Sequence, residues 1–158
     1  MAHALAETLG RLDVAHRDGY QERLGEFQRS MMPLFDKVAA LRAKYAGRAA
    51  TATEPVFGYM AQAVGLAMRN ERFQLAVMNG TEPSATSIAG MEQDLRTRAV
   101  KVLIYNSQTS EALAQRMRAI ARNSGVPVLD VTETLPAGKT YQEWMLGTLS
   151  ALEQALAQ

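Results

Sequence analysis

The sequence contains no cysteine among its 158 residues, which excludes disulfides, thiolate catalysis and every cysteine-based metal site. Aromatic residues make up only 6% of the chain. No apolar run reaches the ~18 residues needed to cross a bilayer. The formal net charge is +1 and no basic run stands out, so nucleic acid is not expected as a partner. The first residues, Met1 to Glu7, lack the charged start of a signal peptide, and we expect none in this chain.

Residues 1–47 have helical periodicity and no strand-like run. Leu5, Leu9 and Leu12 predict a short first helix that breaks between residues 13 and 19, before a longer helix that ends near residue 46. Gly47 suits a left-handed C-cap. Pro33 removes a backbone donor inside the longer helix, so a kink is expected there. We interpret residues 1–47 as an N-terminal helical segment with a long linker helix.

Residues 48–158 alternate short strand candidates with helices, which predicts an α/β lobe. Strands are expected at residues 49–53, 100–105 and 126–129, while residues 72–77 could form a strand or an irregular segment. Helices are expected at residues 56–64, 84–98, 110–123 and from Thr140 onward, where Glu143 completes a capping box. The expected fold is a single Rossmann-like lobe with a roughly four-stranded, mostly parallel sheet flanked by helices and preceded by a long α-helix.

Two glutamates far apart in the chain occupy matching places just after expected strands. Glu54 follows the strand at residues 49–53, and Glu133 follows the last strand. The carboxyl ends of parallel strands meet at one crevice, so these side chains are expected to share a site there. Two carboxylates in a crevice indicate a hard or borderline cation.

Four segments in order resemble the C-terminal half of the periplasmic substrate-binding proteins of zinc and manganese ABC transporters, the adhesin-lipoprotein group. They are Thr53-Glu54-Pro55-Val56-Phe57-Gly58-Tyr59-Met60, Gly80-Thr81-Glu82-Pro83-Ser84, Val102-Leu103-Ile104-Tyr105-Asn106-Ser107-Gln108, and Thr132-Glu133-Thr134-Leu135-Pro136 followed by Thr140-Tyr141. Together they cover most of residues 48–156. The helix before them resembles the helix that spans both lobes in that family.

The resemblance implies a metal-binding C-terminal lobe, at residues 48–158, of a metal-ion importer, and no enzyme. It places the two ligands of this lobe on Glu54 and Glu133, with Asp130 as a rival for the second, and implies Zn²⁺ or Mn²⁺ as cargo. His3 and His16 do not match the histidine ligands of the other lobe, so the chain is expected to be an expressed fragment or a truncated reading frame. The resemblance also implies a membrane permease partner and a periplasmic or membrane-anchored extracellular location.

Other functions stay open on the residues alone. Ser107 has no plausible histidine partner for hydrolysis, whereas a carboxylate pair acting on a sugar is formally possible. A stand-alone flavodoxin-like interaction module without metal is the main alternative, and the long helix could self-associate through its apolar face. Phe57 and Tyr59 are expected to pack rather than to stack on a ligand.

Overall fold

The computed structural model describes residues 1–158, which form two compact units, Met1–Asp36 and Lys37–Gln158. The elements are α1 (Ala2–Leu12), η1 (Val14–His16), α2 (Arg17–Tyr45), β1 (Ala49–Ala52), η2 (Pro55–Phe57), α3 (Gly58–Val64), β2 (Ala67–Arg69), α4 (Glu71–Met78), α5 (Ala85–Arg96), β3 (Leu103–Asn106), α6 (Ala112–Asn123), β4 (Val128–Val131) and α7 (Tyr141–Leu156). No helix combines the length and apolarity that a membrane span requires.

The first unit is helical, and its two helices meet at Asp13. The Asp13 backbone carbonyl accepts from the His16 backbone N–H at 3.2 Å. The Asp13 carboxylate accepts from His16 Nδ1 at 2.9 Å and from the Tyr20 hydroxyl at 3.0 Å. These hydrogen bonds, that of His16 first, hold the pKa of Asp13 below its ordinary value. The predicted break after Leu12 is confirmed, and α2 includes Pro33 within one helix.

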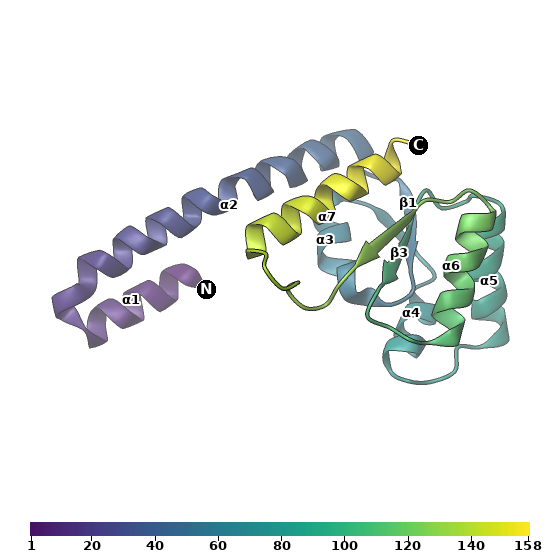
Figure 1. Cartoon of the computed structure of the whole chain (residues 1–158), viewed down its shortest axis with the longest axis horizontal. Helices are drawn as coiled ribbons and strands as arrows, with labels where there is room; N and C mark the ends of the chain where they lie inside the picture. Colours follow the sequence, from purple (N-terminus) through teal and green to yellow (C-terminus); the bar gives the residue numbers. More distant parts are fainter. The chain divides into compact units, whose positions relative to one another are not determined.

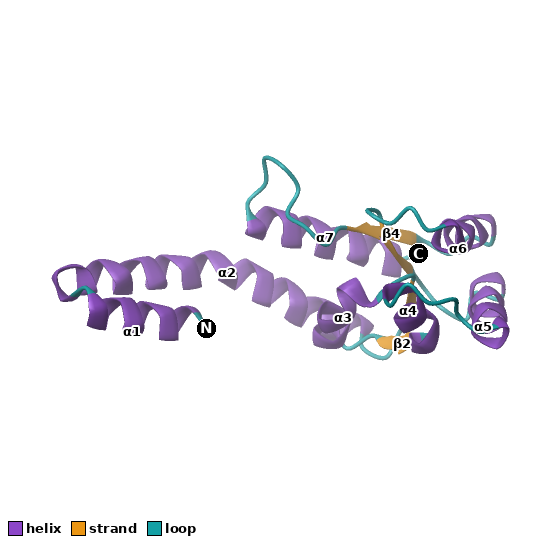
Figure 2. Ribbon diagram, turned by 90° about the horizontal axis from the view of Figure 1, so that it is seen from below, coloured by secondary structure: helices purple, strands orange, loops and turns teal.

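The second unit is an open sheet of four parallel strands in the order β2-β1-β3-β4. Figures 1 and 2 show α5 and α6 on one face of this sheet and α3 and α7 on the other. The α/β fold with a four-stranded parallel sheet, expected from the sequence, is confirmed. Because β2 lies on one side of β1 and β3 on the other, the winding direction changes between β1 and β3, and ligands of such sheets bind at this point.

The prediction for residues 72–77 was wrong, because these residues lie in helix α4 and the missing strand is β2. Strand β2 has only three residues and lies at the sheet edge, so it carries little apolar signal. Gly47 and Gly65 both have φ near +80°, as the predicted left-handed cap at Gly47 requires. The Gly47 N–H donates to the Gly65 carbonyl at 2.8 Å, which fixes the entry to β1 beside the entry to β2.

The main core lies under the face of the sheet that α5 and α6 cover. It consists of nine buried residues, Phe73, Met91, Leu95, Val100, Leu103, Met117, Ile120, Ala121 and Val126. On the other face, α7 buries Leu149, Leu152 and Leu156. The strands bury side chains on both faces, as expected for a parallel sheet between two helical layers.

Helix α7 begins at the predicted capping box. The Thr140 hydroxyl accepts from the Glu143 backbone N–H, and the Glu143 carboxylate accepts from the Thr140 backbone N–H at 2.8 Å. These bonds to Thr140 lower the pKa of Glu143. Near the other end of α7, Glu153 accepts from Lys37 Nζ at 2.5 Å and lies 3.6 Å from Lys44 Nζ. Both lysines lie in the last turns of α2, so these ion pairs join the two helices within the second unit.

This ion pair predicts acid sensitivity. The Lys37 hydrogen bond and charge hold the pKa of Glu153 below its ordinary value of 4.5. The interaction therefore stabilises the fold above the unfolded-state pKa, and this contribution is lost as the pH falls through the lowered value. We expect Glu153→Gln to reduce stability near pH 7 and to reduce it less at about pH 3, because the contribution declines as the pH falls below the ordinary pKa. Urea unfolding monitored by Trp144 fluorescence measures this, with the exposed loop variant Glu82→Gln as control. An equal loss at both pH values would contradict the prediction.

Candidate functional site

The first side of the site forms where β1 ends. The Thr53 N–H still donates to the Ile104 carbonyl at 3.0 Å, which carries the ladder with β3 one residue beyond β1. Pro55 has no N–H, so the chain leaves the sheet and turns into η2. Glu54 lies at this turn in extended conformation and makes no side-chain cap bond to η2. Its carboxylate instead points to Asn106, from which Oε2 accepts a hydrogen bond at 3.2 Å.

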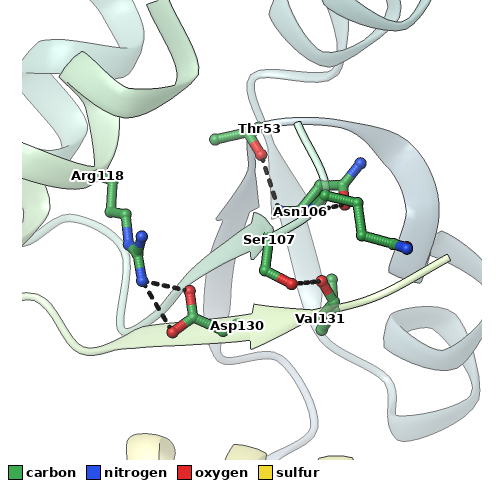
Figure 3. A network of polar contacts seen from close by, with 7 residues as sticks. Thr53, Asn106, Ser107, Arg118, Asp130 and Val131 are labelled. Carbon is green, nitrogen blue, oxygen red and sulfur yellow. Dashed lines mark hydrogen bonds and ion pairs between the residues drawn. The ribbon is translucent and has the colours of Figure 1, made fainter. Parts of the chain in front are cut away.

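The centre of the site is Asn106, the last residue of β3, which is only 2% exposed. Its Nδ2 donates to Glu54 Oε2 at 3.2 Å and to Glu133 Oε1 at 2.6 Å. Its backbone N–H donates to the Thr53 hydroxyl at 3.2 Å (Figure 3). One side-chain amide therefore binds both carboxylates that the sequence singles out.

The loop after β4 is held by the segment that follows β3. The N–H and the hydroxyl of Ser107 both donate to the Val131 carbonyl at 2.9 Å, a contact visible in Figure 3. Gln108 Oε1 accepts from the Glu133 backbone N–H at 2.6 Å, and its Nε2 donates to the Thr134 hydroxyl at 2.8 Å. Glu133 is thus fixed at its backbone by Gln108 and at its carboxylate by Asn106.

Both glutamates line one cavity of about 460 Å³. Its wall is mostly apolar and comes from η2, α3, α4, the end of β4 and α7, namely Pro55, Val56, Phe57, Tyr59, Met60, Met78, Val131, Thr132, Trp144, Met145 and Thr148. The two carboxylates are the only ionisable acids in this wall. Electrostatic interactions are stronger beside an apolar wall than in water, so a cation at this position is attracted more strongly than at an open surface.

The structure brings Glu54 and Glu133 together, as the sequence predicts, and places Asp130 elsewhere. Asp130 lies within β4 and accepts from Arg118 at 2.8 and 3.0 Å, apart from the Asn106 contact (Figure 3). Arg118 also stacks over the Tyr105 ring at 4.5 Å. Asp130 is therefore engaged in an ion pair and does not line the cavity.

Two expectations about other side chains have mixed outcomes. Phe57 is buried, as predicted, but the packing prediction for Tyr59 was wrong, because its side chain is 93% exposed in a helix that starts at the cavity rim. His3 and His16 are exposed residues of the first unit, beside Glu7 and Asp13 respectively. No group of three or more histidine or acidic side chains that could hold a metal ion occurs in residues 1–158.

Sequence reasoning missed the roles of Asn106 and Gln108. Both occur in a segment that carries the family resemblance, yet neither is a charged residue, and a search for metal ligands passes over amides. The signal that could have found Asn106 is its position. It ends the most apolar strand of the chain, and the rule that selects the residue after a parallel strand as a site residue applies to it as well.

The fold is shared with several solved structures. The laminin-binding protein Lbp of Streptococcus pyogenes is 24% identical, with a TM-score of 0.70 over 96% of this chain and 57% of its own length. The periplasmic zinc binding protein TroA from Treponema pallidum is 18% identical, with a TM-score of 0.73 over 99% and 59%. The substrate-binding protein FpvC from Pseudomonas aeruginosa, solved in complex with Mn²⁺, is 21% identical, with a TM-score of 0.67 over 97% and 57%.

At these identities the similarity establishes the fold alone. The chain spans less than three fifths of the length of each of these structures. A comparison with curated proteins gave no match. The family model described as zinc-uptake complex component A, periplasmic, matches residues 1–155, and the chain belongs to this family. The resemblance to zinc and manganese substrate-binding proteins is thereby confirmed.

Proposed function

We propose that this chain is the C-terminal lobe of the substrate-binding component of a metal-ion importer and that it supplies two ligands, Glu54 and Glu133, to a site for Zn²⁺ or Mn²⁺. Residues 48–158 form the lobe, and residues 1–47 form the helical segment with the linker helix. The observation that supports this proposal is the convergence of both carboxylates on the Asn106 amide beside one cavity. The Mn²⁺ complex of the similar protein FpvC and the zinc-uptake description of the family agree with these ions.

Two carboxylates do not complete a metal shell. Structural and transport sites for zinc usually have four ligands, and hard cations of the size of Mn²⁺ take about six. We infer that the remaining ligands come from an N-terminal lobe, as in the two-lobed proteins that the chain resembles. On its own, the chain is then expected to bind either ion with a Kd of roughly millimolar order, because half or more of the ligands are absent.

Location and partners follow from the same proposal. The family description is periplasmic, and we infer that the protein works outside the cytoplasmic membrane, in the periplasm or anchored to the cell surface, and delivers its ion to a membrane permease. Transport binding proteins hold and release a cargo without changing it. We therefore assign binding, and no enzyme activity, to the two carboxylates.

The alternative is a protein-interaction module that binds no metal. One observation favours it, because the first unit exposes Phe27 and Met32 on α2, together with Leu5 and Leu12 on α1. Exposed apolar side chains in this number are typical of a surface that another protein covers. A molecular size that rises with concentration and ignores added metal would favour this module or self-association through the long helix.

Substoichiometric Mn²⁺ tests the metal site directly, because the paramagnetic ion broadens NMR signals near it even when binding is weak. We expect broadening of backbone amides around Glu54, Asn106 and Glu133, and we expect Glu54→Gln combined with Glu133→Gln to abolish it. Asp130→Asn is the matched control, since that carboxylate comes from the same strand and loop region but pairs with Arg118.

Two results would contradict the proposal. Broadening centred elsewhere, or unchanged in the double variant, would remove both glutamates from the site. Calorimetry that shows micromolar or tighter binding of Zn²⁺ to this chain would mean that it holds a complete ligand set, contrary to a shared site.

A further inference from the structure

Asn106 is the one neutral side chain that binds both proposed ligands. Its single NH₂ group uses one hydrogen for Glu54 Oε2 at 3.2 Å and the other for Glu133 Oε1 at 2.6 Å. Two carboxylates this close repel each other, and a buried amide that donates to both offsets part of that repulsion. Without a metal ion, the Asn106 amide therefore offsets the repulsion between the two carboxylates, as a bound cation would.

The orientation of the Asn106 amide is fixed from its other end. Asn106 Oδ1 accepts from the Gln108 backbone N–H at 3.1 Å, and the Asn106 backbone N–H donates to Thr53. Turning the amide to offer its oxygen to an ion would break the bond from Gln108 and would direct an N–H at an N–H. Asn106 thus directs its N–H donors at the two carboxylates, and its oxygen is not available as a metal ligand.

We propose that metal binding at this site is an exchange, in which the ion takes Glu54 Oε2 and Glu133 Oε1 and the Asn106 amide gives up both hydrogen bonds. This inference rests on the proposed function, because it requires the ion to bind these two glutamates. An ion that bridges both oxygens at the usual metal–carboxylate distance of about 2.0–2.2 Å takes the position between them at which the Asn106 NH₂ group now donates, so the two compete for the same lone pairs. Asn106 is a positioning residue that holds the carboxylates of Glu54 and Glu133 together through its NH₂ group.

The exchange predicts two effects of Asn106→Ala that have opposite signs. The unloaded variant is less stable, because both carboxylates lose their donor. It nevertheless binds Zn²⁺ roughly tenfold more tightly, because hydrogen bonds to charged groups no longer have to be broken on binding. A side chain with a merely structural role would lower stability and weaken binding together. Calorimetry or an NMR titration with Zn²⁺ alone measures the affinity, and thermal unfolding without metal measures the stability.

Gln108→Ala is the matched control. Gln108 fixes the Glu133 backbone but touches neither carboxylate. Its removal frees the loop, so we expect weaker Zn²⁺ binding, the reverse of the result for Asn106→Ala. Should Asn106→Ala fail to fold, Asn106→Ser serves in its place, since serine keeps a polar group at the strand end but is too short to reach both carboxylates.

A second measurement uses the unmodified protein. The two Nδ2 protons of Asn106 are held by carboxylates in the unloaded state, and we expect Zn²⁺ saturation to increase their exchange with solvent. If the ion uses the other oxygen of each carboxylate, these protons stay protected and Asn106→Ala binds no more tightly, which overturns the exchange but not the site. Zn²⁺ binding that is insensitive to the double variant Glu54→Gln and Glu133→Gln overturns both proposals.

Discussion

Phe73→Ala is expected to destabilise the second unit by about 3–5 kcal/mol. Phe73 lies in α4, has no exposed surface and belongs to the core cluster with Met91 and Leu95 of α5 and Leu103 of β3. Removing the ring gives up its transfer free energy and leaves a cavity that rigid neighbours on α5 and β3 cannot fill. The Tm of a chain of this length should fall by on the order of 10 °C.

The single tryptophan, Trp144 in α7, makes the measurement specific to the second unit. Urea unfolding followed by its fluorescence gives the free energy of unfolding from the midpoint and slope. Leu75→Ala is the control on the same helix, because Leu75 is 47% exposed and should cost about 1 kcal/mol. If the two variants lose the same free energy of unfolding, Phe73 is not buried in the core as the structure shows.

The helix that contains Phe73 is also the part of the fold that could not be predicted from the sequence. Strongly apolar runs such as Val102-Leu103-Ile104-Tyr105, and capped helices such as the one that begins at Thr140, identify their own structure, and both are found where expected. Residues 71–78 are a short segment in which five of the eight residues are apolar, and no side chain caps the helix at Asn70, so the local pattern does not separate helix from strand. Their helix is decided by tertiary contacts, above all by the burial of Phe73.

Some features of the candidate site could likewise be predicted from the sequence, and others could not. Parallel strands end at one edge, so the sequence suffices to bring Glu54 and Glu133 into one crevice. It does not give the strand order, and only the order β2-β1-β3-β4 puts the end of β3 between the ends of β1 and β4. The central place of Asn106 follows from that order. The sequence also does not show that Asp130 lies within β4 opposite Tyr105 and pairs with Arg118, whereas Glu133 follows the strand.

That central place makes Asn106→Asp the substitution with the largest expected effect on the site. The change keeps the size of the side chain but replaces the donor with a third carboxylate, within hydrogen-bond distance of two others. Without metal, we expect the variant to be about 1–3 kcal/mol less stable than the unmodified protein, because donors become like charges. Thermal unfolding of the metal-free protein measures this loss.

Zn²⁺ is expected to have the opposite effect on this variant and to stabilise it. The third carboxylate is an additional ligand at the position where the ion is proposed to replace the amide. We expect Asn106→Asp to bind Zn²⁺ at least about tenfold more tightly than Asn106→Ala, and metal at 100 times its Kd to raise stability by about 2.7 kcal/mol. The comparison with Asn106→Ala separates the effect of the new charge from that of the lost donor. If the metal-free variant is as stable as the unmodified protein, the carboxylates do not meet at Asn106. If it binds Zn²⁺ no more tightly than Asn106→Ala, the ion lies away from the end of β3.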